Sequence, residues 1–494
     1  MTAAAALVFA AVLGQPNGSI EYAGPVRVVN LWGSWGDMGY AEGYLLGPEI
    51  MDLYEVYLVE LAGGTGGVET ARRFVEEHFQ FPLEFRKMAS GMLAGMADTC
   101  GLYSSVFGRD LDTLDVYVAA SAPDLSDLMA NRFVSCSSTS AWGDATAADP
   151  VLGGDPAMSR NLDYFIDTGS VLLEHQVLFT LDPEIGNDWI SVGMAGFMGC
   201  LSGMNEYGVC AALDMGNYYG IEKWEPAFVP ICAAQALGLS ALDFDNSGKH
   251  DILDVEAALT NWNRSCSYCI HLLAPEALAP EEPGEVVEIN NLAGSAVRHS
   301  WDDAEMPRQH LCLTNHHRVL YPPVACDRYA LLSDSIGADP SMTLDRLWGL
   351  MAAVGFAPVP GAGGTVQTMI LIPADRRIGL AFTAPGSPSY GQSPQWIEWG
   401  DLFPNHTPGG IGGEGQPSMT PMAWPNPVLG RVVVSWPGAG SPALFDAAGR
   451  LVDAEFTPSG EGLFALDTEG LPPGVYLVST GISAGYSLKL VVAD

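Results

Sequence analysis

Residues 135–165, SCSSTSAWGDATAADPVLGGDPAMSRNLDYF, decide how this chain is interpreted. Cys136 lies in a run of small hydroxyl residues. About two dozen residues later the chain has a compact cluster of polar residues, Arg160, Asn161 and Asp163. A cysteine nucleophile needs a base that removes the thiol proton, and no histidine is near Cys136 in the sequence. A chain-terminal amine, whose ordinary pKa is about 7.7–8, can be that base. The pattern favours a nucleophile that begins a chain, although most isolated cysteines are small buried apolar residues.

The composition excludes one class of partner. The chain has 494 residues, of which 48% are hydrophobic, as in globular proteins with two or three domains. Its 58 acidic and 21 basic residues give a formal net charge of −37. Such a charge repels nucleic acid and anionic membrane surfaces. We therefore expect no nucleic-acid partner.

The N-terminus predicts export. Residues 1–24 contain the apolar run AAAALVFAAVLG, which is too short to span a bilayer and is typical of the central part of a signal peptide. No lysine or arginine precedes this run, so a buried N-terminal strand or helix is the alternative. No other window is long and apolar enough for a transmembrane span.

The hydrophobic pattern divides the rest of the chain into four segments. Residues 25–135 carry apolar residues at helical spacing and predict a helical leader. Residues 136–401 alternate short β-like runs with turns and helical stretches, which predicts an α+β domain. Residues 402–424 are rich in glycine and proline and predict a linker. Residues 425–494 read as short strands of a small β-sandwich.

The stretch around Cys136 resembles the nucleophile region of the cysteine N-terminal nucleophile (Ntn) hydrolases. It is most similar to the isopenicillin N acyltransferase-like proteins, and more distantly to choloylglycine hydrolases and acid ceramidases. In that family a Gly-Arg-Asn-x-Asp pattern follows the cysteine, and residues 159–163 match it with serine in place of glycine. GCLSGMNEYGV supplies Asn205, and LTNHHRVLYPPVACDR supplies Asn315 and Arg328. The resemblance covers roughly residues 30–395 and implies an αββα four-layer sandwich.

The same resemblance implies a mechanism that needs no cofactor. The chain would cleave itself between Ser135 and Cys136, and the new amine would take the thiol proton. The thiolate would then attack an amide or thioester carbonyl. Water or an acceptor amine would resolve the acyl-enzyme. The expected substrate is therefore a small molecule with an amide or acyl group.

The remaining family residues receive roles by resemblance. Asn205 and Asn315 would donate hydrogen bonds to the oxyanion. Asp163 would hold the α-ammonium group, and Arg160 would lower the pKa of the thiol. Arg328 would orient the aspartate or bind substrate. The residues alone leave two alternatives open: an ordinary buried ion-pair network for the charged residues, and turn chemistry for the asparagines.

Three functions follow from these observations. The leading one is a secreted hydrolase or acyltransferase that acts on a non-peptide amide bond. A peptidase or dipeptidase of the same superfamily is the first alternative. The second is an inactive, calcium-stabilised surface or scaffold protein. Ser135 supports this last alternative, because self-cleaving relatives usually have glycine there and a β-carbon hinders the N-to-S acyl shift.

An acidic segment, LDFDNSGKHDILDVEAAL, predicts a calcium loop as an insertion at residues 241–256. Its spacing matches an EF-hand, which places oxygen ligands at alternating positions around a glycine. It also resembles one repeat of a dockerin module. His250 departs from the usual apolar residue, and a plain acidic turn that caps the next helix is the alternative. The expected ligands of a structural Ca²⁺ are Asp243, Asp245, Ser247, Lys249 (through its carbonyl), Asp251 and Asp254.

The C-terminal segment carries the patterns PNP, FDAAGR and LPPGVYLV. These resemble a type A sorting domain of the type nine secretion system. The resemblance implies that secretion machinery is a partner and that the protein is secreted or attached to the cell surface. An unrelated β-sandwich binding module is the alternative.

Overall fold

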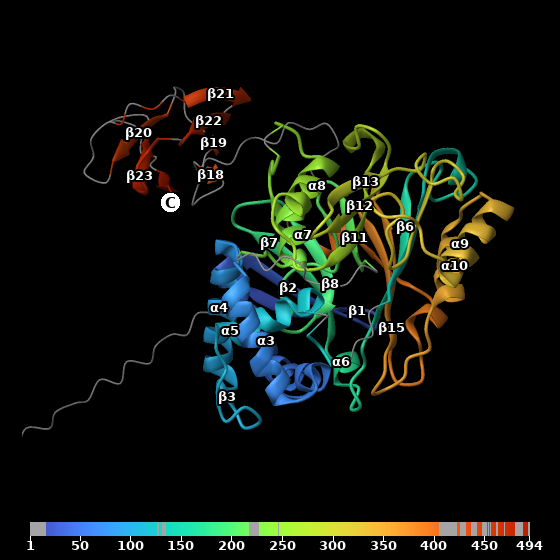
Figure 1. Cartoon of the computed structure of the whole chain (residues 1–494), viewed down its shortest axis with the longest axis horizontal. Coiled ribbons are helices and arrows are strands. Elements are labelled where there is room, and N and C mark those ends of the chain that lie inside the picture. Colours follow the sequence, from blue (N-terminus) through green and yellow to red (C-terminus); the bar gives the residue numbers. More distant parts are fainter. Residues whose placement is uncertain are drawn as a thin grey trace, which may run out of the picture. The chain divides into compact units, whose positions relative to one another are not determined.

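The computed structural model describes most of the chain. The chain divides into two compact units (Figure 1). The first unit comprises residues 1–245 and 250–408, and the second comprises residues 409–494 and 246–249. The described residues are 16–125, 128–130, 135–216, 227–245 and 247–404, and between 422 and 492 the strands with some of their connections.

The first unit is built on two β-sheets. The larger sheet is antiparallel except where β2 and β7 run parallel, and the smaller sheet is antiparallel throughout. The nine-stranded sheet has the order β1 (Gly18–Ala23), β2 (Val26–Gly33), β7 (Gln176–Pro183), β8 (Trp189–Met194), β9 (Ser202–Asn205), β10 (Cys210–Met215), β11 (Ser267–Leu273), β12 (Gly284–Asn290) and β13 (Gly294–Arg298). The six-stranded sheet has the order β14 (His310–Leu313), β5 (Ser137–Ala141), β6 (Ala157–Tyr164), β15 (Gly364–Ile372), β16 (Arg377–Phe382) and β17 (Gln395–Glu398).

One apolar core joins the two sheets. Alternate residues of the larger sheet, such as Ile190 and Val192, belong to the same buried cluster as Leu311 and Leu313 of the smaller sheet. Alternation arises because successive strand residues point to opposite faces. The opposite face of the smaller sheet forms a second cluster with the helices α9 (Asp327–Ala338) and α10 (Leu344–Val354). The facing surfaces of the sheets therefore bury one layer of side chains.

Helices contact the outer sides of both sheets. α1 contacts β2 and β7, α7 contacts β9 and β10, and α10 contacts β5, β6 and β15. In Figure 1, α9 and α10 lie together beside β6 and β15, and α3, α4 and α5 gather on the other side of this unit. The helices are α1 (Trp35–Asp52), the π-helical η1 (Leu53–Leu58), α2 (Val59–Ala62), α3 (Thr65–His78), α4 (Leu83–Thr99), α5 (Thr113–Ala120), α6 (Val171–Glu174), α7 (Ile231–Ser240), α8 (Ile252–Thr260), α9 (Asp327–Ala338), α10 (Leu344–Val354) and α11 (Trp399–Leu402), with a small hairpin of β3 (Tyr103–Ser104) and β4 (Arg109–Asp110).

The leader helices α1 and α4 pack through glycine. A β-carbon at Gly39 would lie 2.1 Å from the carbonyl oxygen of Met88, and one at Gly43 would lie 1.9 Å from that of Met92. Backbone contact this close excludes a side chain. The capping box of Ser34 and Asp37 fixes the start of α1. The repeated glycines of this segment therefore serve helix packing.

The α+β class is confirmed, and the described part of residues 25–135 is mainly helical. The predicted signal peptide, residues 1–24, needs a correction at its C-terminal end. Residues 18–23 form β1, which pairs with β2 along its whole length. These residues therefore belong to the folded domain, whereas both the signal peptide and its strand-or-helix alternative were predicted from the apolar run AAAALVFAAVLG and stay predictions. Residues 1–15 lie outside the described residues. Within the described ranges, no helix combines the length and apolar character needed to cross a bilayer.

The second unit contains two small sheets. Val432 and Leu466 of one sheet share a buried cluster with Leu444, Val478 and Leu490 of the other. This packing is that of the small β-sandwich expected from the sequence. Most of the expected linker, residues 405–421, lies outside the described residues. The strands are β18 (Met422–Trp424), β19 (Arg431–Ser435), β22 (Leu463–Asp467) and β21 (Phe456–Gly460) in one sheet, and β20 (Ala443–Asp446), β23 (Gly474–Ser479) and β24 (Leu488–Val492) in the other.

Candidate active site

Cys136 directly precedes β5, and strand pairing determines its neighbours. In the pairing of β5 with β14, Leu313 faces Ser138; continuing this register puts Asn315 across from Cys136. In the pairing with β6, Arg160 also faces Ser138 and therefore lies diagonally from Cys136 on the same face. Antiparallel pairing thus brings together residues that are far apart in the sequence.

Asn315 and Arg328 hold the backbone of Cys136. The Cys136 N–H donates to Asn315 Oδ1 at 2.8 Å, and Arg328 Nη1 donates to the Cys136 carbonyl oxygen at 2.7 Å. Arg328 Nη2 also donates to Asn315 Oδ1 at 2.8 Å. Asn315 Nδ2 donates to the Met215 carbonyl oxygen at 3.0 Å. Two donors on one side and a carbonyl on the other fix the orientation of this amide.

The thiol of Cys136 is buried, with 1% of the residue exposed. Its Sγ lies 3.8 Å from Arg160 Nη2 and 3.9 Å from the carbonyl oxygen of Asp163. Burial raises the pKa of the Cys136 thiol to about 12; the charge of Asp214 adds to this, and Arg160 opposes it. Arg160 acts in the direction expected from the sequence, but burial outweighs it. In the uncut chain Cys136 is therefore a neutral thiol near pH 7.

Arg160 and Asp214 form a buried pair between the sheets. Arg160 Nη1 donates to the Leu201 carbonyl oxygen at 2.9 Å, Nη2 donates to that of Leu213, and Nε lies 3.8 Å from Asp214 Oδ1. Neither carboxylate oxygen of Asp214 has a hydrogen-bond partner among the described residues. Burial raises the pKa of Asp214 to about 7, although Arg160 opposes this. Sequence reasoning missed Asp214; an acidic residue inside the apolar run GVCAALDM was the available signal.

Asp163 lies at the end of β6, close to Arg328. Its Oδ1 accepts a hydrogen bond from Thr365 Oγ1 at 2.5 Å, and its Oδ2 lies 3.7 Å from Arg328 Nη1. Oδ2 is buried and has no hydrogen-bond partner within the described part of the chain. Burial raises the pKa of Asp163 to about 7, against the effects of Thr365, Arg328 and Arg160. This carboxyl therefore has an unused acceptor beside the Cys136 backbone.

The side chain of Asn205 forms hydrogen bonds within the turn between β9 and β10. Its Oδ1 accepts from the backbone N–H groups of Tyr207 and Val209 at 3.1 and 3.0 Å, and its Nδ2 donates to the Leu239 carbonyl oxygen at 3.1 Å. None of the hydrogen bonds among the described residues links Asn205 to Cys136. These bonds are the turn chemistry that the sequence left open. The oxyanion roles of Asn205 and Asn315 stay predictions, because each Nδ2 here donates to a backbone carbonyl.

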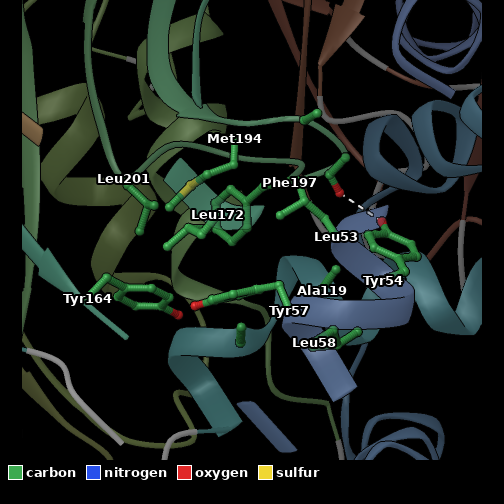
Figure 2. A pocket seen from close by; sticks show the side chains of 13 residues that line it. Leu53, Tyr54, Tyr57, Leu58, Ala119, Tyr164, Leu172, Met194, Phe197 and Leu201 are labelled. Carbon is green, nitrogen blue, oxygen red and sulfur yellow. Dashed lines mark hydrogen bonds between the residues drawn. The ribbon is translucent and has the colours of Figure 1, made fainter. Parts of the chain in front are cut away.

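An apolar pocket lies beside this site (Figure 2). Leu201 lines it, and the carbonyl oxygen of Leu201 accepts from Arg160. Tyr164, which follows Asp163, also lines it; its ring and that of Tyr57 have centroids 6.4 Å apart, and Figure 2 shows their hydroxyl ends pointing toward one another. The other lining residues are Leu53, Tyr54, Leu58, Ala119, Ala122, Leu172, Met194, Ala195, Gly196 and Phe197.

The leader segment forms one wall of this pocket. Tyr54 donates from its hydroxyl to the Gly196 carbonyl oxygen at 2.8 Å, which is the dashed line in Figure 2. The Gly196 N–H donates to Glu42 of α1 at 2.9 Å. Both backbone groups of Gly196 are thus tied to the leader. Sequence reasoning missed this wall, because the leader and the Gly196 loop meet only in the tertiary structure.

The acidic loop brings three of its predicted calcium ligands together. Carboxylate oxygens of Asp243, Asp245 and Asp254 lie within 4.8 Å of one another. Asp254 Oδ1 accepts from the Phe244 N–H at 2.5 Å, and Asp254 Oδ2 accepts from the Asp251 N–H at 3.1 Å. Burial raises the pKa of Asp254 to about 7. An all-oxygen donor set suits Ca²⁺, but Asp254 is also the N3 residue of the capping box of α8.

Asp251, the fourth predicted carboxylate ligand, is not part of that group of three. Asp251 is the N-cap of α8, and its Oδ1 accepts from the Leu253 N–H at 2.9 Å. Ser247 Oγ accepts from the Lys249 N–H at 3.3 Å. The helix-capping alternative is therefore present in the structure, and calcium binding stays a prediction.

The C-terminal unit is identified by comparison with known families. Residues 422–493 match the family described as the secretion system C-terminal sorting domain. The unit is a sorting domain. The protein is accordingly secreted or held at the cell surface, as the PNP, FDAAGR and LPPGVYLV patterns indicated.

Comparison of the whole chain returns one relative and several solved structures. An uncharacterised protein of Archaeoglobus fulgidus is 25% identical over 209 residues, which are 38% of this chain; the match spans 32% of that relative. The Caenorhabditis elegans ortholog of N-acylethanolamine-hydrolyzing acid amidase matches 52% of this chain and 98% of its own, at 15% identity and a TM-score of 0.35. Penicillin V acylase of Agrobacterium tumefaciens matches 54% of this chain and 88% of its own, at 14% identity and a TM-score of 0.33.

A third solved structure is a conjugated bile acid hydrolase of Clostridium perfringens. It matches 53% of this chain and 97% of its own, at 11% identity and a TM-score of 0.32.

Proposed function

We propose that the protein is a secreted cysteine Ntn hydrolase or acyltransferase that acts on a non-peptide amide bond. Cys136 is its nucleophile, and cleavage of the Ser135–Cys136 bond activates it. The two facing sheets with helices on their outer sides would then be the αββα sandwich of that class. The observation that carries the proposal is the arrangement around Cys136: Asn315 at its nitrogen, Arg328 at its carbonyl oxygen and Arg160 at its sulfur.

Cleavage would convert the Cys136 backbone nitrogen into the missing base. That nitrogen already lies 2.8 Å from Asn315 Oδ1, which would keep one N–H in place and fix the direction of the lone pair. The buried Oδ2 of Asp163 would accept from the ammonium form of the amine. The amine takes the thiol proton, and the positive charge of Arg160, 3.8 Å from Sγ, then stabilises the thiolate.

The apolar pocket indicates the acyl part of the substrate. Its walls are mainly aliphatic and aromatic, and it adjoins the Arg160 side of the site through Leu201. Burying an apolar chain there gains about 25 cal/mol for each Å² removed from water. We therefore propose an apolar acyl group on the substrate. A peptidase of the same superfamily remains the alternative, and amide substrates with apolar and with dipeptide acyl groups separate the two.

The inactive scaffold is the second candidate, and one observation favours it. In the uncut chain the thiol has a pKa of about 12 and the Cys136 nitrogen is a peptide N–H, so the site has no base. Ser135 carries the side chain that would hinder the acyl shift. A chain that never cleaves would therefore show no turnover.

The experiment is the intact mass of the purified protein beside Cys136→Ala, with N-terminal sequencing of any fragment. We expect a fragment that begins at Cys136 in the native protein and a single chain in the variant. A single chain in both would overturn the proposal in favour of the scaffold. Cys326→Ser is the matched control, because that cysteine lies outside the proposed chemistry and its loss should leave the cleavage unchanged.

A further inference from the structure

A second cysteine lies in a cluster of polar side chains at the start of α9. Cys326 is the N-cap residue of this 12-residue helix. Its Sγ lies 3.7 Å from Thr314 Oγ1, and Thr314 Oγ1 lies 2.9 Å from His316 Nε2. Arg328 follows in the first turn of the helix. The thiol thus has a hydroxyl, an imidazole, a guanidinium and a helix N-terminus around it.

His316 is placed to act on this thiol. It is 1% exposed, and its Nδ1 has no hydrogen-bond partner within the described part of the chain. Burial disfavours the thiolate of Cys326, but hydrogen bonds from His316, from the Tyr329 N–H and from Thr314 outweigh it and lower the pKa of Cys326 to about 6. The charge of Arg328 acts in the same direction. Near pH 7 this thiol is mostly thiolate, which is the reactive form.

Cys326 is also accessible. It is half-buried, and the four residues before it, 322–325, are exposed. Cys100 provides a contrast: the residue is exposed, but partial burial of the thiol raises its pKa. Cys136 is buried and has a raised pKa. The proposed nucleophile is therefore shielded in the uncut chain, whereas Cys326 combines partial exposure with a stabilised thiolate.

We propose that Cys326 is a site of reversible covalent modification that exchanges with low-molecular-weight disulfides. The Cys326 thiolate attacks one sulfur of the disulfide, and a new S–S bond forms as the old one breaks. The other half leaves as a thiolate and takes a proton from water, so no further oxidant is needed. Secreted proteins meet oxidising conditions in which such disulfides persist. The adduct would lie two residues from Arg328, which holds the Cys136 carbonyl and Asn315.

The test uses the full-length reduced protein and glutathione disulfide at pH 7, followed by peptide mass spectrometry. We expect one adduct, on Cys326, that dithiothreitol removes. Its formation should be about tenfold or more faster than reaction at Cys100, because the thiolate fraction is higher even though a low-pKa thiolate is a weaker nucleophile. Cys100→Ser should leave the adduct in place, and Cys326→Ser should abolish it.

A second measurement tests the role of the cluster without relying on the adduct. The rate of iodoacetamide alkylation at Cys326 should reach half its plateau near pH 6, the pKa of this thiol. Thr314→Val keeps the shape of the side chain but removes the hydroxyl, so it should shift this midpoint to higher pH. Preferred reaction at Cys100, or an alkylation midpoint near the ordinary cysteine value of about 8.5, would overturn the proposal.

Discussion

Two buried charge clusters lie in the first unit, and they differ in how well their carboxylates are satisfied. Glu288 of β12 accepts at Oε1 from Arg298 Nε and at Oε2 from the backbone N–H groups of Val319 and Leu320. Asp214 and Asp163, by contrast, keep three carboxylate oxygens without a hydrogen-bond partner among the described residues. Both clusters contain arginine and both are inaccessible to water.

The difference distinguishes a structural cluster from a site whose carboxylate oxygens can still accept hydrogen bonds. Hydrogen bonds that satisfy a buried carboxylate stabilise one conformation. A buried carboxylate that lacks them is costly, and such groups concentrate where a later step or a ligand needs them. The Glu288 cluster fixes the segment after His317. The Asp163 and Asp214 cluster surrounds Cys136, where the proposed cleavage would create a new ammonium group.

The largest effect is expected for Asp163→Asn. An asparagine keeps the shape but has no charge to pair with the α-ammonium, so Cys136-dependent turnover of an apolar amide should fall roughly a thousandfold. The readout is the initial rate with the melting temperature as control. An unchanged rate in a cleaved, active enzyme would remove Asp163 from the mechanism.

The second prediction compares the unfolding free energies of two variants, Glu288→Gln and Asp214→Asn. The Gln amide would turn two donor hydrogens toward backbone N–H groups that also donate, so the unfolding free energy should fall by about 3 kcal/mol. Asp214→Asn should lower it by less at pH 7, since no hydrogen bond is lost and only the charge opposite Arg160 is removed. Denaturant unfolding measures both. Equal losses would show that the two clusters do not differ.

A smaller effect concerns pH. Burial raises the pKa of Asp214 to about 7, so the folded protein binds this proton more tightly than the unfolded chain. The stabilisation that the protonated Asp214 gives to the folded protein is complete below pH 4, near the ordinary pKa of an aspartate. This stabilisation is lost as the pH rises through 7. Asp214→Asn, which stays neutral, should therefore gain stability relative to the native protein between pH 4 and pH 8. A difference in melting temperature that is constant over this range would contradict the raised pKa.

The smallest effect is expected from calcium. If the acidic loop binds Ca²⁺, adding the ion after chelation should raise the melting temperature by about 1–3 °C through mass action. Asp243→Asn should remove this shift, while Glu288→Gln should keep it. No shift in the native protein would leave Asp251 and Asp254 as the cap of α8 alone.

Part of the site was predictable because it is local in the sequence. The Arg-Asn-x-Asp pattern identified Arg160 and Asp163 as candidate site residues from one short segment, which forms β6. Asn205 shows where this reasoning stopped: its motif was recognised, but its amide is bonded to its own turn. Asp214 was missed because its local signal, an acid inside the apolar run GVCAALDM, does not show that the acid faces an arginine.

The sequence by itself determined the α+β class, the mainly helical character of residues 25–135, and the C-terminal sandwich with its sorting patterns. These follow from periodicity and from short motifs, which depend on neighbours in the chain. Only the tertiary structure decided that β1 belongs to the large sheet, that the leader walls the apolar pocket, and that Cys136 is buried while Cys326 is accessible. Burial, strand register and the sum of nearby charges depend on residues far apart in the chain, and these set the chemistry of each thiol.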